Sequence, residues 1–175
     1  MRVRRRRLRG LLVGAGCLVG DPTWPTWGLG LLVLSLGAAL HLASKGVLEQ
    51  NERLTTAGPY RWTRNPFYVA NGLIDAGLCL VIGRAWIAVV YAGLWWLAYR
   101  ETIAREEQRL RELFGATFDG YAERVPRLVP TLHPLPVGEA RGRFSFANPS
   151  LSRGREYARL VGVGLAAGAI GVAAE

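Results

Sequence analysis

The chain has 175 residues, of which half are hydrophobic, and it carries a formal net charge of +9. This charge does not indicate nucleic-acid binding, because the basic residues flank apolar segments, where they set membrane orientation. Cys17 and Cys79 each lie inside an apolar run without a nearby histidine, so neither a disulfide framework nor a metal site is indicated. The clumped apolar residues instead predict an all-α integral membrane protein.

A basic segment followed by a short apolar run, Leu8–Gly20, opens the sequence. This pattern is also typical of a signal peptide, but Gly14 stands where a lipoprotein signal ending at Cys17 has a large aliphatic residue, and no Ala-x-Ala site follows. We therefore expect a retained first helix. The second apolar run, Leu29–Ala43, reaches spanning length when its flanks from Trp24 to Lys45 are included.

A polar segment, Gly46–Arg64, follows, and its Ala57-Gly58-Pro59 signal predicts a turn. The third apolar run, Pro66–Ile82, begins with proline at a tolerated first-turn position. Gly83-Arg84 predicts a tight turn. The fourth run, Ala85–Tyr99, continues without glycine or proline into a charged segment, so we expect one helix to pass from lipid into water.

Four spans return every arginine block to the same side of the membrane, which the positive-inside bias makes cytoplasmic. We thus predict a bundle of about four transmembrane helices with a cytoplasmic N-terminus and site, in a bacterial-type inner membrane. The apolar tail Tyr157–Ala174 crosses the membrane, lies in its interface or packs on the bundle. We predict a helical membrane domain over 1–130 and an extension with a C-terminal apolar helix over 131–175.

Two polar clusters lie on the predicted cytoplasmic side. The first, GPYRWTRNPFY at 58–68, is by itself typical of a membrane-interface belt, with rings at headgroup depth and arginines on phosphates. The second, Arg100–Tyr121, contains the adjacent acids Glu106 and Glu107. Consecutive helical residues point about 100° apart, so at most one acid needs to face inward. The charge pattern alone is typical of a solvated helix face with Glu–Arg pairs.

Taken together and in order, these clusters resemble the isoprenylcysteine carboxyl methyltransferase and phospholipid methyltransferase superfamily over about residues 53–130. The matching motifs are Gly58-Pro59-Tyr60, Arg64-Asn65-Pro66-Phe67-Tyr68, Glu106-Glu107 with Leu110, Phe114-Gly115, Tyr121 and Val125-Pro126-Arg127. The resemblance implies a membrane-embedded enzyme that uses S-adenosylmethionine without a Rossmann sheet. The sequence likewise lacks the strand-Gly-x-Gly-helix pattern of soluble cofactor domains.

Carried onto this sequence, the resemblance implies a cofactor site and a catalytic set. The cofactor-binding residues are Arg53, Leu54, Thr55, Tyr60, Asn65, Pro66, Phe67 and Tyr68, and the catalytic residues are Glu106, Glu107 and Arg100. Aromatic faces suit a sulfonium cation or an adenine, and arginine or backbone N–H groups suit a carboxylate. Glu106 is the better candidate for the acceptor-side carboxylate, and the implied acceptor is a lipid, a prenylated molecule or another lipophilic compound.

This sequence departs from the family pattern at two positions. Asn65 replaces the usual histidine of Arg-His-Pro, and Thr102 replaces an arginine one turn before the first glutamate. An amide can still form hydrogen bonds, but it cannot transfer a proton. A carboxylate acceptor needs no general base, whereas an amine must shed a proton, which Glu106 or Glu107 can assist if burial raises its pKa. The alternatives are a non-catalytic protein that keeps the fold, or a lipid-binding membrane module.

Other polar residues lie within the predicted spans. Asn71 and Asp75 are four residues apart and form one stripe inside the bundle. Asp75 either lines a route for the acceptor or forms a hydrogen bond across helices. His41 is expected to be a packed or interfacial histidine, because no other titratable residue is spaced to act with it, and His133 receives no role.

Overall fold

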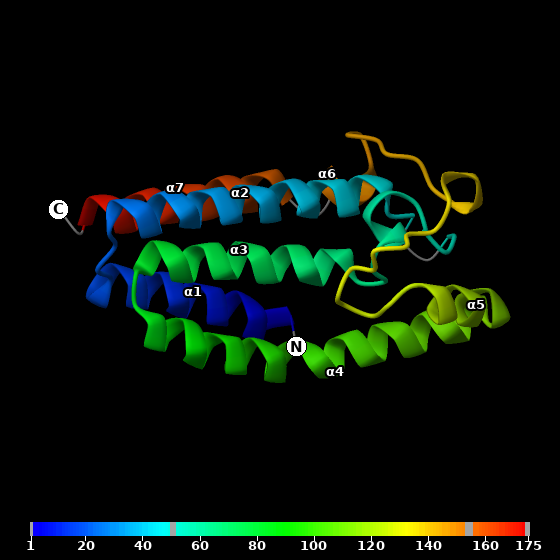
Figure 1. The fold of residues 1–175 in the computed structure, drawn as a ribbon, viewed down its shortest axis with the longest axis horizontal. Coiled ribbons are helices and arrows are strands. Elements are labelled where there is room, and N and C mark those ends of the chain that lie inside the picture. The colour runs from blue at the N-terminus through cyan, green and yellow to red at the C-terminus, as the bar shows by residue number, and fades with distance from the viewer. Residues whose placement is uncertain (1, 50–51, 153–155, 174–175) are drawn as a thin grey trace. The chain divides into compact units, whose positions relative to one another are not determined.

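The computed structural model describes residues 2–49, 52–152 and 156–173, and these residues contain helices but no β-strand. The all-α prediction is therefore confirmed for the described part of the chain. Figure 1 shows the helices in chain order. They are α1 (Arg2–Val19), α2 (Trp24–Val47), the 3-10 helix η1 (Gly58–Arg61), α3 (Pro66–Ile82), α4 (Ala85–Phe114), α5 (Ala116–Arg124), the 3-10 helix η2 (Val137–Glu139), α6 (Pro149–Ser152) and α7 (Glu156–Ala173).

The predicted helix boundaries are confirmed where glycine and proline mark them. Helix α3 begins at Pro66, and α4 runs unbroken through 30 residues, as the absence of glycine and proline near its polar half predicts. Gly83 turns the chain between these helices with φ of +75°, a conformation that a residue with a Cβ adopts only at a cost. A Cβ at this position would also approach the Asp21 carbonyl oxygen to 2.3 Å.

Among the described helices, α2 is long and apolar enough to cross a membrane. The apolar part of α1, Leu8–Val19, and the 17 residues of α3 fall short of the roughly 20 residues that a span needs. In α4 the apolar part ends before Arg100, where charged residues begin. The four predicted crossings are therefore not confirmed, because within the described residues helix length and composition support only one of them.

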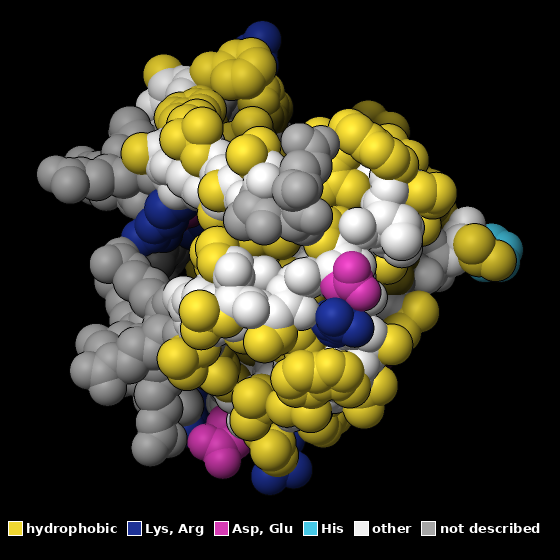
Figure 2. All heavy atoms as spheres, turned by 90° about the vertical axis from the view of Figure 1, so that its left-hand side faces the viewer, with side chains coloured by type: hydrophobic (Ala, Val, Ile, Leu, Met, Phe, Trp, Pro, Cys, Tyr) yellow, Lys and Arg dark blue, Asp and Glu magenta, His cyan; other side chains and the backbone are white. Residues whose placement is uncertain are grey.

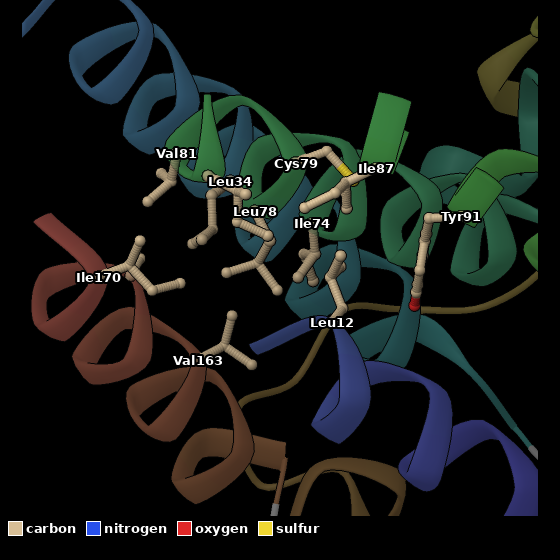
Figure 3. Packing of buried hydrophobic residues seen from close by; sticks show 12 residues of the cluster. Leu12, Leu34, Ile74, Leu78, Cys79, Val81, Ile87, Tyr91, Val163 and Ile170 are labelled. Atoms are coloured by element: carbon tan, nitrogen blue, oxygen red, sulfur yellow. The ribbon is translucent and has the colours of Figure 1, made fainter. Parts of the chain in front are cut away.

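The chain forms two compact units, each made of segments distant in sequence. The first contains residues 1–38, 71–100 and 158–175, and the second contains 39–70 and 101–157. In the first unit, side chains from α1, α2, α3, α4 and α7 meet in one apolar core (Figure 3). Ile74, Leu78, Val81 and Ile82 of α3 are fully buried there, so α3 is the central helix of this unit. The predicted domain boundary at residue 130 stays a prediction.

Helices α2 and α3 approach closely through glycines. A Cβ on Gly77 would lie 2.6 Å from the Leu34 backbone nitrogen and 2.7 Å from the Gly30 carbonyl oxygen. Neither backbone atom can move without shifting its helix. Both glycines are therefore required by this packing, which is the usual role of small residues between membrane helices.

The polar stripe on α3 is occupied by an ion pair. Arg9 of α1 donates from Nε to Asp75 Oδ1 over 2.6 Å and from Nη2 to Asn71 Oδ1 over 3.3 Å. Tyr91 of α4 donates its hydroxyl to Asp75 Oδ2 over 3.1 Å. Of the two roles predicted for Asp75, these contacts favour hydrogen bonding across helices, because each of its carboxylate oxygens already has a partner.

The outer surface of the first unit is strongly apolar. Figure 2 shows hydrophobic side chains covering much of the face at the end where α2 begins and α7 ends, with few charged groups between them. Large side chains such as Leu18, Trp24, Val89 and Leu165 are each more than 70% exposed. A contiguous apolar surface of this kind marks contact with a membrane or a partner.

The second unit has its own apolar core. It is formed by Leu54, Phe118, Tyr121, Val125 and Leu135, with Leu110, Phe114 and Ala122 packed against it. Beyond residue 140, the chain returns to the end of α2 and to the loop that follows it. Arg141 N donates to Thr56 Oγ1 over 2.8 Å, Ser145 N donates to Gly46 O, and Asn148 Nδ2 donates to the same carbonyl.

Candidate cofactor and acceptor site

The segment GPYRWTRNPFY folds as a short 3-10 helix that leads into α3. Gly58 starts η1 with φ of +56°, and Pro59 fits the first turn because that position needs no backbone N–H. Tyr60 and Tyr68 are buried, whereas Trp62 is 43% exposed. Tyr121 fixes the turn by donating its hydroxyl to the Tyr60 carbonyl oxygen over 2.7 Å. The segment is thus a packed wall rather than a row of solvent-facing rings.

Glu107 of α4 holds this segment through charged hydrogen bonds. Arg64 donates from Nε to Glu107 Oε1 over 3.0 Å, and Arg127 donates from Nε to Oε2 over 2.8 Å. Asn65 donates from Nδ2 to Oε1 over 3.0 Å. The carboxylate is 5% exposed, so its charge is balanced by two guanidinium groups rather than by water.

The environment of Glu107 keeps it ionised. Burial alone would raise its pKa, but the hydrogen bonds from Arg127 and Arg64 outweigh burial and hold the pKa below its usual value. A carboxylate with a lowered pKa is a weak proton acceptor. Glu107 therefore serves better as a structural anion than as a general base.

Asn65 is held by the same network. Its Nδ2 also donates to the Arg127 carbonyl oxygen over 3.1 Å, so both amide hydrogens point at oxygen acceptors. This pattern fixes the orientation of the amide, because Oδ1 in that position would meet two other acceptors. Only Oδ1 is left to receive a hydrogen bond from a ligand.

Glu106, in contrast, is exposed. Burial is the main cause that raises the pKa of Tyr60, and the negative charge of Glu106 is the second cause. The Glu106 carboxylate therefore lies near the Tyr60 phenol. Tyr68 acts on Tyr60 in the same direction, and the Tyr60 hydroxyl stays protonated. Glu107 is thus the one glutamate of the pair that is buried, in keeping with the expectation that at most one needs to face inward, and Glu106 remains accessible near Tyr60.

Phe67 and Tyr68 lie in an aromatic cluster with α2. The rings of Phe67 and Tyr68 meet edge to face at 5.6 Å, and His41 packs against Phe67 at 4.9 Å. Lys45, one turn after His41, places its ammonium group 4.5 Å from the centre of the Phe67 ring. Phe67 therefore already accepts one cation, which shows that its face suits such groups.

The other predicted site residues have diverse surroundings. Arg53 is exposed and forms an ion pair with Glu49, and Pro66 is fully buried at the start of α3. Leu54 belongs to the apolar core of the second unit, where it also borders a shallow recess with Tyr121 and Arg124. Thr55 is buried and accepts a hydrogen bond from Glu49 N. Arg100 is exposed and belongs to the first unit.

Sequence reasoning missed two features of this region. Arg127 was noted only as part of a motif, although it completes the charge balance of Glu107. His41 has a titratable partner after all, since its Nε2 lies 3.1 Å from Glu156 Oε2. His41 is a packed histidine, as expected. The premise that no titratable residue would accompany it was wrong, because 115 residues separate the pair in sequence, a distance at which spacing gives no signal.

Comparison with known proteins gives a consistent result. Residues 26–117, just over half of the chain, match the family model described as phospholipid methyltransferase. Protein-S-isoprenylcysteine O-methyltransferase B of Arabidopsis thaliana is 32% identical over 82 residues, which cover 47% of this chain and 42% of that protein. The mouse protein-S-isoprenylcysteine O-methyltransferase is 29% identical over 65% of this chain and 47% of its own length.

A metal-resistance protein is also similar. The cobalt-zinc-cadmium resistance protein CzcN of Cupriavidus metallidurans is 32% identical over 67% of this chain and 58% of its own length. The chain thus spans less than half of the two methyltransferases and somewhat more of CzcN. No solved structure gives a significant match.

Proposed function

This chain belongs to the phospholipid methyltransferase family, and we propose that it is a membrane-embedded methyltransferase that uses S-adenosylmethionine to methylate a lipophilic or membrane-presented acceptor. One observation carries the proposal beyond family membership. Glu107 binds Arg64, Asn65 and Arg127 together, and this holds the segment that contains Tyr60 and Tyr68 against α4.

The residues of this segment fit the proposed cofactor. S-adenosylmethionine supplies an activated methyl group on a sulfonium cation. The faces of Tyr60, Phe67 and Tyr68 suit that cation or the adenine, and Lys45 over Phe67 is an example of such a contact within the chain. The free Oδ1 of Asn65 can accept a hydrogen bond from an amino or ribose group. Arg53 is exposed and can bind a carboxylate.

The chain's own task is to align the reacting groups and exclude water. Glu107 positions the wall of the site, while the exposed Glu106 faces the acceptor or its ammonium group. Arg100 is the proposed contact for an anionic acceptor. These assignments place the site at the polar end of α4, which we propose to be cytoplasmic in a bacterial-type inner membrane.

Two acceptor classes agree with the relatives. The Arabidopsis and mouse proteins are named for methylation of isoprenylcysteine at oxygen, and the family model is named for phospholipids. A prenylated carboxylate is already nucleophilic, whereas an amine lipid must lose a proton first.

Calorimetry of S-adenosylmethionine binding to the detergent-purified protein tests the proposal. Tyr68→Ala should weaken binding at least tenfold, because it removes a buried ring from the site wall. Trp62→Ala is the matched control, since this ring lies in the same segment but is exposed. Absence of binding to folded wild-type protein, or equal affinities for all three, would refute the site.

A non-catalytic protein that keeps the family fold is the second candidate. It is favoured by Asn65, whose amide hydrogens are both committed to the Glu107 network. Asn65→His separates the two candidates if methyl transfer to a vesicle lipid or to a farnesylated cysteine analogue is measured. A gain of transfer supports a decayed site, whereas a loss supports a working site adapted to asparagine.

A further inference from the structure

A short aromatic and basic loop lies beyond the part of the chain that the family model matches. Residues 141–146, with the sequence RGRFSF, contain two arginines and two phenylalanines. This RGRFSF loop lies between η2 and α6. Figure 1 shows this part of the chain returning to the end of α2. The proposed methyl transfer gives the loop no role.

The RGRFSF loop is held in place by its backbone. The carbonyl oxygen of Arg141 accepts a hydrogen bond from Thr56 N over 2.9 Å, and Ser145 N donates to Gly46 O over 2.9 Å. The ring of Phe144 packs directly on α2, because a Cβ on Gly46 would overlap it. The loop therefore has a fixed position beside the last turn of α2.

The aromatic rings of the loop are nevertheless exposed. Phe146 is 72% exposed and Phe144 is 41% exposed, and their rings meet edge to face at 4.8 Å. Tyr157, at the start of α7, is 42% exposed and donates its hydroxyl to the Phe146 carbonyl oxygen over 3.4 Å. An exposed apolar cluster on an ordered segment indicates a contact outside the chain.

The position of the loop along α2 indicates what this contact is. Helix α2 is long and apolar enough to cross a membrane, and Trp24 and Trp27 lie at its beginning. Gly46 lies about 33 Å further along the helix axis at about 1.5 Å per residue, slightly more than the ~30 Å hydrocarbon core. Tryptophan is typical of the membrane–water interface, so Gly46 and the ring of Phe144 lie at the opposite interface.

The arginines of the loop complement an anionic surface. Arg141 and Arg143 are exposed, and within the described residues neither forms an ion pair. Glu139, which precedes the loop, is paired with Arg124 instead. Basic residues next to a membrane-crossing helix are attracted to anionic lipids, and aromatic rings are enriched at the same depth.

We propose that the RGRFSF loop docks on an anionic bilayer surface. Phe144, Phe146 and Tyr157 then lie at the depth of the lipid glycerol groups, and Arg141 and Arg143 bind lipid phosphates. The inference goes beyond methyl transfer and needs neither the cofactor nor the acceptor. It rests on the proposed membrane embedding, through the crossing by α2.

Fluorine-19 NMR of the full chain tests where the rings lie. The protein is labelled with fluorophenylalanine and placed in nanodiscs that contain phosphatidylglycerol. The chain has five phenylalanines, so Phe144→Leu and Phe146→Leu identify two signals by elimination. A nitroxide on the lipid near its glycerol group should broaden both signals, and a water-soluble gadolinium chelate should broaden them much less. Phe118, identified by Phe118→Leu, is the internal control, because it is 1% exposed and should respond to neither reagent.

Two results of this measurement would overturn the proposal. Broadening of the Phe146 signal by the gadolinium chelate but not by the lipid nitroxide would place the loop in water. Protection of Phe146 from both reagents would show that a second copy of the chain or another protein covers the rings.

Native mass spectrometry of the detergent-purified chain, titrated with phosphatidylglycerol or phosphatidylcholine, measures the contribution of charge. Arg143→Gln should lower the affinity for phosphatidylglycerol about fivefold, because one arginine near an anionic membrane surface contributes about 1 kcal/mol. The affinity for phosphatidylcholine should not change. Arg109→Gln is the matched control, since Arg109 is exposed in the charged half of α4, away from the loop in sequence.

The lipid titrations also have outcomes that contradict the docking. Equal affinities of the wild-type chain for the two lipids, or equal losses in Arg143→Gln and Arg109→Gln, would overturn it. Failure of the wild-type chain to enter nanodiscs would refute the proposed membrane embedding, and this docking with it. Absence of S-adenosylmethionine binding in a chain whose loop does contact lipid would refute the methyltransferase proposal alone.

Discussion

The Glu107 network makes a strong prediction about stability. Glu107→Gln preserves the size of the side chain but replaces one carboxylate oxygen with an amide NH2 group. That group would face the guanidinium groups of Arg64 and Arg127, so donors would meet donors. Because the Arg64 side chain is only 13% exposed, water cannot fully replace the lost negative charge of Glu107.

The expected loss follows from these contacts. Breaking a buried ion pair typically costs about 3–5 kcal/mol. The lower end applies here, because Arg64 keeps its bonds to the carbonyl oxygens of Ala122 and Val125, and Arg127 is 54% exposed. We expect a loss of about 3 kcal/mol, which corresponds to a fall in Tm of about 6–12 °C for a chain of this length.

Thermal unfolding in detergent, followed by tryptophan fluorescence, measures this shift. Glu106→Gln is the matched control, since the neighbouring residue is exposed and should change stability by less than about 0.5 kcal/mol. Equal Tm values for the two variants would refute the reasoning, as would a larger fall for Glu106→Gln.

Further predictions concern pH, packing and topology. Because the pKa of Glu107 is lowered in the folded state, its ionised form stabilises the fold above the ordinary carboxyl pKa of 4.5. This stabilisation is lost as pH falls through the folded-state pKa. Unfolding scans from pH 7 to pH 3 should therefore show a weaker dependence of stability on acid in Glu107→Gln than in the wild type. Gly77→Ala should cost about 1–3 kcal/mol by overpacking, whereas Gly93→Ala, with open space around its Cβ, should not lower Tm. Asp75→Asn should lower Tm by weakening the bond to Arg9, and an unchanged Tm would show that this ion pair is not stabilising. Arg84→Cys should be labelled by a membrane-impermeant thiol reagent from outside the cell, and labelling only after permeabilisation would contradict four spans.

The sequence by itself determined the helices and their ends. Long runs of apolar residues indicate helix even where they contain glycine, and glycine with positive φ or proline marks where a helix begins or the chain turns. Helix α3 therefore begins at Pro66 and the chain turns at Gly83, as expected. The order of the motifs along the chain also indicated the family, because the Arg64–Tyr68 segment and the two adjacent glutamates can be recognised from neighbouring residues without knowledge of the fold.

Only the tertiary structure decided which charges are paired. Glu106 and Glu107 are neighbours with the same chemistry, and their different burial depends on Arg64 and Arg127, which reach α4 from distant segments. Likewise, His41 acquires a partner only because the chain after residue 140 returns to α2. Burial and charge compensation depend on contacts between residues far apart in sequence. Helix propensity is a property of each residue and its nearest neighbours. For this reason the helices can be derived from the sequence alone, whereas the charge pairs cannot.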